Sequence, residues 1–284
     1  MSTGLNLPPI VSHSMLATID DYVICDVRWY LDSRSGRDAY LVGHLPGAVF
    51  VDLEEHLTSE PSPGAGRHPL PTESDFAASM GSLGIGPEDP VIAYDDAGGM
   101  AAGRLVWMLR ILGRPAALLD GGIDAWSGPL EMKATTRPPK EVPAVPWPAD
   151  ALVTMSEVAE MISSKGGILL DARSAERYRG EVEPMDPRAG HVPGAVNAPY
   201  VKNLAADGPE AGRFLSPAEL ENRYRSLGVN DARTAVAYCG SGVSACHDLL
   251  AMEYAGLGRG RLFVGSWSQW SHTDRPLATG IEQV

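Results

Sequence analysis

The stretch TAVAYCGSGVSACHDLLAMEYAG, residues 234–256, places a short apolar run directly before a cysteine and a glycine-containing loop. The run AVAY is typical of a buried parallel strand, and the residues after the loop have helix-like spacing. A matching stretch, PVIAYDDAGGMAAGRLVWMLRILG, occupies residues 90–113. Strand, loop and helix in this order predict an α/β fold with a mainly parallel sheet, in which ligands bind at the carboxyl ends of the strands.

Around these two stretches, the two halves of the chain match in order and spacing. Three further motif pairs are ICDVRW at 24–29 with LLDARS at 169–174, GHLPGAV at 43–49 with GHVPGAV at 190–196, and DGGIDAW at 120–126 with VGSWSQW at 264–270. In this alignment Asp95 precedes Cys239 by 144 residues. The repeat predicts a domain duplication. We expect domains over 1–130 and 151–284, joined by a proline-rich linker over 131–150.

Composition limits the possible functions. The chain has 284 residues, 44% of them hydrophobic and 21% charged, which is ordinary for globular domains. Its formal net charge of −13 disfavours nucleic acids and anionic membranes as partners, because both are polyanions. No apolar run is long enough for a bilayer and no secretory signal opens the chain, so a soluble, cytoplasmic protein is expected. The three cysteines show no disulfide pattern or metal-ligand spacing, so neither a metal nor another cofactor is implied.

Cys239 is the candidate nucleophile, because it ends an apolar strand and precedes a small loop and a helix. The loop residues after it are Gly240, Ser241, Gly242, Val243 and Ser244. Backbone N–H groups of such a loop can point at one sulfur and stabilise a thiolate, and they can cradle a second, negatively charged sulfur bonded to the first. The alternative is a buried, inert cysteine, but a strand-to-helix turn beside glycines is a poor place for a core residue.

The repeated pattern, the GHxPGA turns and the CGSGVSA loop together resemble the rhodanese superfamily, and most closely its tandem-domain 3-mercaptopyruvate sulfurtransferases. The resemblance implies two tandem rhodanese-like domains, each a mainly parallel sheet flanked by helices, of which only the second is catalytic. Asp95 fits the inactive domain, since a carboxylate cannot accept a sulfane sulfur. The implied cycle forms a persulfide on Cys239 from a small anionic sulfur donor, and then passes the sulfur to cyanide, a low-molecular thiol or a thioredoxin-like protein.

Two donors fit this resemblance, 3-mercaptopyruvate and thiosulfate. Relatives that prefer thiosulfate tend to carry basic side chains in the loop, whereas this loop begins Gly-Ser-Gly, so mercaptopyruvate is favoured. The stretch from Arg177 to Arg188 resembles the family segment whose two end arginines bind the substrate. A planar guanidinium suits a carboxylate, although surface ion pairs are the alternative for any single arginine. Arg179 is the nearest substitute.

The resemblance also implies a proton relay, in which the loop serine joins a histidine and an acid from the first half. Ser241, His68 and Glu54 match these positions and could move a proton as the enolate of pyruvate leaves. The alternative for His68 is an ordinary surface-loop histidine beside a proline. His44 and His191 lie in the matching GHxPGA turns, so a shared role in the fold is expected for them.

The leading hypothesis is therefore an enzyme that moves sulfane sulfur from 3-mercaptopyruvate to cyanide or a thiol through Cys239. A thiosulfate:cyanide sulfurtransferase is the alternative within the same chemistry. A persulfide carrier or sensor without turnover is the rival from a different class. A purely structural pseudo-enzyme is disfavoured by the intact cysteine loop, since a degenerate copy should resemble the loop at Asp95.

Overall fold

The computed structural model describes residues 7–32, 34–164 and 166–280. The chain forms two compact units. The first takes in the chain up to Ser59, Leu70–Pro148 and Ala206–Phe214, and the second takes in Glu60–Pro69, Ala149–Ala205 and the chain from Leu215. The boundaries predicted from sequence treat each domain as an uninterrupted piece, whereas each unit also includes a short segment from the other half of the chain.

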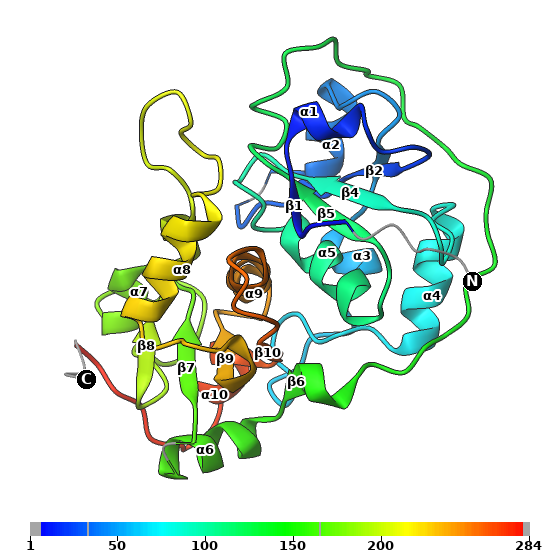
Figure 1. The fold of residues 1–284 in the computed structure, drawn as a ribbon. Coiled ribbons are helices and arrows are strands. Elements are labelled where there is room, and N and C mark those ends of the chain that lie inside the picture. The colour runs from blue at the N-terminus through cyan, green and yellow to red at the C-terminus, as the bar shows by residue number, and fades with distance from the viewer. Residues whose placement is uncertain (1–6, 33, 165, 281–284) are drawn as a thin grey trace. The chain divides into compact units, whose positions relative to one another are not determined.

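The first unit is built on a parallel sheet. Its strands are β1 (Ile10–Val11), β2 (Val23–Asp26), β3 (Val49–Phe50), β4 (Val91–Tyr94) and β5 (Ala116–Leu119), and they lie in the order β1-β5-β4-β2-β3 (Figure 1). Its helices are α1 (His13–Leu16), α2 (Gly36–Val42), α3 (Leu53–His56), α4 (Glu73–Ser82) and α5 (Ala102–Ile111). Leu16 of α1 and Tyr40 of α2 join the buried cluster on one face of the sheet, and α5 contacts β4 and β5.

The second unit repeats this architecture. Its strands are β6 (Leu152–Val153), β7 (Ile168–Asp171), β8 (Ala195–Asn197), β9 (Ala235–Tyr238) and β10 (Arg261–Phe263), in the order β6-β10-β9-β7-β8 with every pair parallel (Figure 1). Its α-helices are α6 (Met155–Ser164), α7 (Ala175–Arg179), α8 (Pro217–Ser226), α9 (Ser244–Tyr254) and α10 (Ser266–Trp270). Its short 3-10 helices are η1 (Ala149–Ala151), η2 (Tyr200–Asn203) and η3 (Ala232–Thr234). The equivalent strand orders confirm the predicted α/β fold with two similar sheets.

Strand β9 is buried on both faces, as its apolar run predicts. Val236 and Tyr238 point into the cluster that α6, α7 and α10 build with Val158, Tyr178 and Trp267. Because successive side chains of a strand point to opposite faces, the alanines of β9 face the other side, where α9 contacts β9 and β10. The strand that precedes Cys239 is therefore held by apolar packing on both sides.

The histidines of the GHxPGA turns have the structural role expected of them. His44 and His191 are both fully buried. Hydrogen bonds of 2.8 and 2.7 Å join their Nδ1 atoms to the carbonyl oxygens of Tyr40 and Tyr178. Each imidazole also stacks on the ring of the same tyrosine, with ring centroids 3.8 and 3.7 Å apart. The same arrangement in both units ties these residues to the fold rather than to the chemistry of one loop.

A buried polar cluster fixes the helix that follows the cysteine loop. Asn203 Nδ2 and the Tyr224 hydroxyl both donate to Asp248 Oδ1, at 2.7 and 3.0 Å. Burial of Asp248 raises its pKa to about 6. These bonds connect α8 and η2 to α9, so the start of α9 is positioned by polar contacts as well as by packing.

The predicted linker runs along the first unit. Its backbone pairs with that of the GHLPGAV turn through Glu131 and His44, with N–H···O distances of 2.8 and 2.9 Å. Further along, the Thr135 N–H donates to the Tyr40 hydroxyl at 2.8 Å, and the Trp147 indole donates to a carbonyl oxygen of the same unit at 2.9 Å. These bonds give the proline-rich segment a defined path on the unit that it follows.

Candidate functional site

Cys239 lies at the carboxyl end of β9, where the strand turns into the loop before α9. Its side chain is buried, and its Sγ accepts from the backbone N–H groups of Gly242 at 3.1 Å and Ser241 at 3.5 Å. Gly242 has a φ of +79°, a left-handed conformation that favours glycine and aims its N–H at the sulfur. The loop thus points amide donors at one sulfur atom.

Helix α10 holds this loop from the other side. The N–H groups of Trp267 and Ser268 donate to the carbonyl oxygens of Cys239 and Gly240, at 3.0 and 2.8 Å. The Cys239 N–H donates to the Ser266 hydroxyl at 3.2 Å. These bonds engage both carbonyls and so restrict the orientation of the peptide groups that follow Cys239 and Gly240.

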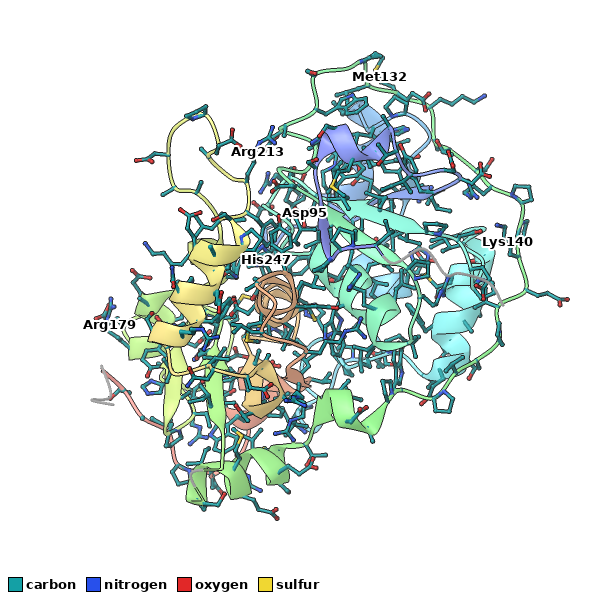
Figure 2. All side chains as sticks on the ribbon, in the orientation of Figure 1. Asp95, Met132, Lys140, Arg179, Arg213 and His247 are labelled. Carbon is teal, nitrogen blue, oxygen red and sulfur yellow. The ribbon has the colours of Figure 1, made fainter. Side chains whose placement is uncertain are left out.

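The equivalent loop of the first unit holds a carboxylate. Asp95, labelled in Figure 2, follows β4 and is 1% exposed. Its Oδ1 accepts from the N–H groups of residues 97 and 99, and its Oδ2 from those of residues 101 and 102, all at 2.8–2.9 Å. Burial raises the pKa of Asp95, while the four N–H groups act to lower it. This loop type therefore surrounds an acidic group with converging backbone donors.

Ser241 and His68, which the sequence pairs in a relay, lie together in the second unit. A hydrogen bond of 2.7 Å joins Ser241 Oγ to His68 Nδ1, and both side chains are buried. His68 belongs to the 60–69 segment, which the second unit includes. Glu54, the third predicted member, is an exposed residue of the first unit, where it accepts from the Trp29 indole at 3.2 Å.

Two arginines lie beside Gly240. A methyl group built on this glycine would come within 2.9 Å of Arg67 Nη2 and 3.3 Å of Arg177 Nη1. Arg177 was predicted from the sequence, but Arg67 was not. The one feature of the sequence that points to Arg67 is its position next to His68 in the GRHPLP stretch. The positive charge that the loop itself lacks is thus supplied by side chains from two other segments.

Carboxylates accompany these arginines. Arg177 pairs with Glu183 at 2.6 Å, and Asp186 contacts both Arg67 and Arg177. Burial raises the pKa of Asp186, Arg67 and Arg177 act to lower it, and Glu183 acts to raise it. The arginines beside the cysteine loop therefore belong to a network of ion pairs and are not isolated cations.

Arg188 and Arg179 have other partners. The guanidinium of Arg188 forms four hydrogen bonds of 3.0–3.2 Å to the backbone carbonyls of Trp270, Ser271 and Arg275. Arg179 projects from α7 (Figure 2) and pairs with Glu181 at 2.7 Å. The structure thus brings Arg177 to the loop, whereas Arg188 anchors backbone near the C-terminal end of the second unit.

Over the described ranges, no group of three or more His, Cys, Asp or Glu side chains is arranged to hold a metal ion. None of the helices in the same ranges is both long enough and apolar enough to span a membrane.

Comparison with known proteins gives one consistent result. The family model for the rhodanese-like domain matches residues 13–129 and 154–273. A Pseudomonas aeruginosa protein named as a probable 3-mercaptopyruvate sulfurtransferase is 40% identical, with 92% of this chain and 93% of that protein covered. The thiosulfate sulfurtransferase of Bos taurus is 34% identical, with 89% and 86% covered. The crystal structure of SseA from Escherichia coli, described as a 3-mercaptopyruvate sulfotransferase, superposes with a TM-score of 0.78 at 30% identity and covers 92% of this chain and 99% of that one.

Proposed function

Since the chain is a sulfurtransferase of the rhodanese family, we propose that it carries sulfur as a persulfide on Cys239 and takes that sulfur from 3-mercaptopyruvate. The acceptor is cyanide or a thiol. The residues proposed for the reaction are Cys239 as nucleophile, Arg177 and Arg67 for the donor's carboxylate, and Ser241 with His68 for proton transfer.

The Asp95 loop is the observation that carries the persulfide proposal. The carboxylate oxygens of Asp95 lie two bonds beyond Cβ, and four backbone N–H groups hold them. The outer sulfur of a persulfide on Cys239 would also lie two bonds beyond Cβ. The duplicated loop of the second unit is therefore suited to hold an anionic outer sulfur in the place where the first unit holds oxygen.

The reaction follows from this arrangement. The thiolate of Cys239 attacks the sulfur of mercaptopyruvate, an S–S bond forms, and the C–S bond breaks to leave the enolate of pyruvate. The thiol proton of the donor ends on the methylene carbon, which gives pyruvate and an anionic persulfide. Cyanide then attacks the outer sulfur, which releases thiocyanate and restores the thiolate.

The donor's carboxylate is assigned to Arg177 and Arg67 rather than to Arg188. Both guanidiniums lie beside Gly240, and a carboxylate can accept charge-assisted hydrogen bonds from each. Arg188 has four of its donors bound to backbone carbonyls, so its contribution is to position the backbone around Trp270. Thiosulfate is the second candidate donor, because two arginines beside the loop also suit a more highly charged anion.

The relay is proposed on the Ser241–His68 hydrogen bond of 2.7 Å. The enolate of pyruvate needs a proton, and a serine hydroxyl backed by an imidazole can supply one. Glu54, the acid that the family resemblance implies, belongs to the first unit, and the proposed relay does not depend on it.

Replacing Ser241 by alanine should lower kcat with mercaptopyruvate by about 100-fold. Turnover with thiosulfate should change much less, because sulfite leaves without a proton. Steady-state rates with the two donors, measured on the same preparation, compare the variant with an internal control. An equal loss with both donors would contradict the relay and point to a role in shaping the loop.

The direct test of the persulfide is mass spectrometry after donor treatment without an acceptor. The peptide that contains Cys239 should gain one sulfur, and added cyanide should remove it. The peptide that contains Cys25 is an internal control, and fragment ions should place the added sulfur on Cys239 rather than on Cys246, seven residues further along the chain. An unmodified Cys239 peptide after exposure to both donors would overturn the proposed function.

A further inference from the structure

Asp186 bridges the two arginines at Gly240. Its Oδ1 pairs with Arg67 Nη1, and its Oδ2 lies 3.4 Å from Arg177 Nη2. The nitrogens that come nearest to Gly240 are the other terminal nitrogens, Arg67 Nη2 and Arg177 Nη1. Arg67 therefore has one terminal nitrogen on Asp186 and the other beside the loop, whereas both terminal nitrogens of Arg177 lie near Gly240 and its Nη2 also contacts Asp186. Only 1% of the Asp186 side chain is exposed, so solvent screens this bridge weakly.

The ion-pair network around this bridge is balanced in charge. Arg177 also pairs with Glu183 at 2.6 Å, and Glu183 lies 3.2 Å from a third arginine, which in turn pairs with Asp171 at 2.7 Å. The three basic members are Arg67, Arg173 and Arg177, and the three acidic members are Asp171, Glu183 and Asp186. The formal charge of the network is therefore zero, although two guanidiniums lie beside Gly240.

This balance affects donors according to their charge. Mercaptopyruvate carries one negative charge, on its carboxylate, and thiosulfate carries two. An ionised Asp186 offsets part of the electrostatic attraction that Arg67 and Arg177 exert on an anionic donor. By Coulomb's law, the Asp186 carboxylate repels a dianion about twice as strongly as a monoanion at the same distance.

We propose that Asp186 is a specificity-determining residue, which cancels the advantage that Arg67 and Arg177 alone would give a dianionic donor over a donor with a single negative charge. The inference rests on the proposed function. It attributes discrimination by donor charge to a residue outside the cysteine loop. Asp186 acts through the two arginines and is not itself required to touch the reacting sulfur.

The test is the ratio of kcat/KM for thiosulfate to kcat/KM for mercaptopyruvate. Asp186→Asn keeps the shape and an acceptor oxygen but removes the charge, so this ratio should rise about tenfold, mainly through the KM for thiosulfate. Glu181→Gln is the matched control, because Glu181 is an exposed acid of the same segment that pairs with Arg179. The control should keep the wild-type ratio. An unchanged ratio in Asp186→Asn, or an equal rise in Glu181→Gln, would overturn the inference.

A second measurement needs no variant. In the wild-type protein, sulfate as a dianionic competitor should inhibit no more strongly than pyruvate as a monoanionic one, because the charge of the network is balanced. Sulfate that inhibits about tenfold or more strongly than pyruvate would overturn the inference even if Asp186→Asn failed to fold. Absence of sulfur on wild-type Cys239 after treatment with either donor would instead overturn the proposed function, so the two failures are distinguishable.

Discussion

Replacing Cys239 by serine should lower turnover with both mercaptopyruvate and thiosulfate by about 10⁴-fold or more, because a hydroxyl in place of the thiolate cannot hold sulfane sulfur. Thiocyanate formation in the presence of cyanide measures the loss. The fold should persist, since serine can occupy the same loop and accept from the same N–H groups.

Cys246→Ser is the matched control for this loss. Cys246 is buried in α9, and its Sγ donates to the Gly242 carbonyl at 3.3 Å, a bond that a serine hydroxyl can replace. This variant should retain most of the wild-type turnover. Activity that survives in Cys239→Ser and disappears in Cys246→Ser would move the reactive sulfur to the other cysteine. Multiple turnovers by the wild-type protein would also separate an enzyme from a persulfide carrier.

The second large effect is expected at Arg177. Replacing it by methionine should lower kcat/KM for mercaptopyruvate by about 100-fold, since charge-assisted hydrogen bonds contribute about 3 kcal/mol and tenfold corresponds to about 1.4 kcal/mol. The loss should lie mostly in KM. Removal of the guanidinium also leaves the carboxylates of Glu183 and Asp186 less compensated, and these would repel the anionic donor.

Arg179→Met is the comparison that makes this result specific. Arg179 lies two positions further along α7, and its guanidinium pairs with the exposed Glu181. Its replacement should leave KM within the error of the measurement. An unchanged KM in Arg177→Met would remove Arg177 from the carboxylate role, and an equal rise in both variants would indicate a general charge effect. Unfolding midpoints of the two variants check that neither loss reflects misfolding.

The local parts of the site could be predicted from the sequence. The run AVAY forms β9, and Cys239 lies where the run ends, because apolar length and a following glycine determine both features locally. The duplication also predicted that Asp95 would replace the nucleophile in an equivalent loop. The strand order inside each sheet is set by packing between distant segments, and the sequence pattern alone did not specify it.

The arginine network could not be predicted in the same way. Arg67 reaches the loop because the 60–69 segment folds with the second unit. The spacing of residues in the sequence does not predict which unit this segment joins. Arg188 matches the family segment in type and approximate position, but its donors are bound to backbone carbonyls. A residue's type and spacing can predict what chemistry is available, whereas its partners determine whether that chemistry is free to be used.

The 60–69 segment has a practical consequence for work with shortened chains. A fragment cut at the boundary that the repeat suggests, from residue 151 onward, would keep the nucleophile and its loop. It would lose Arg67 and His68 together, and with them one of the two cations proposed to bind the donor and the histidine of the proposed relay. On the proposed function, we expect a chain that begins at residue 151 to transfer sulfur poorly, so truncation experiments should retain both halves of the polypeptide.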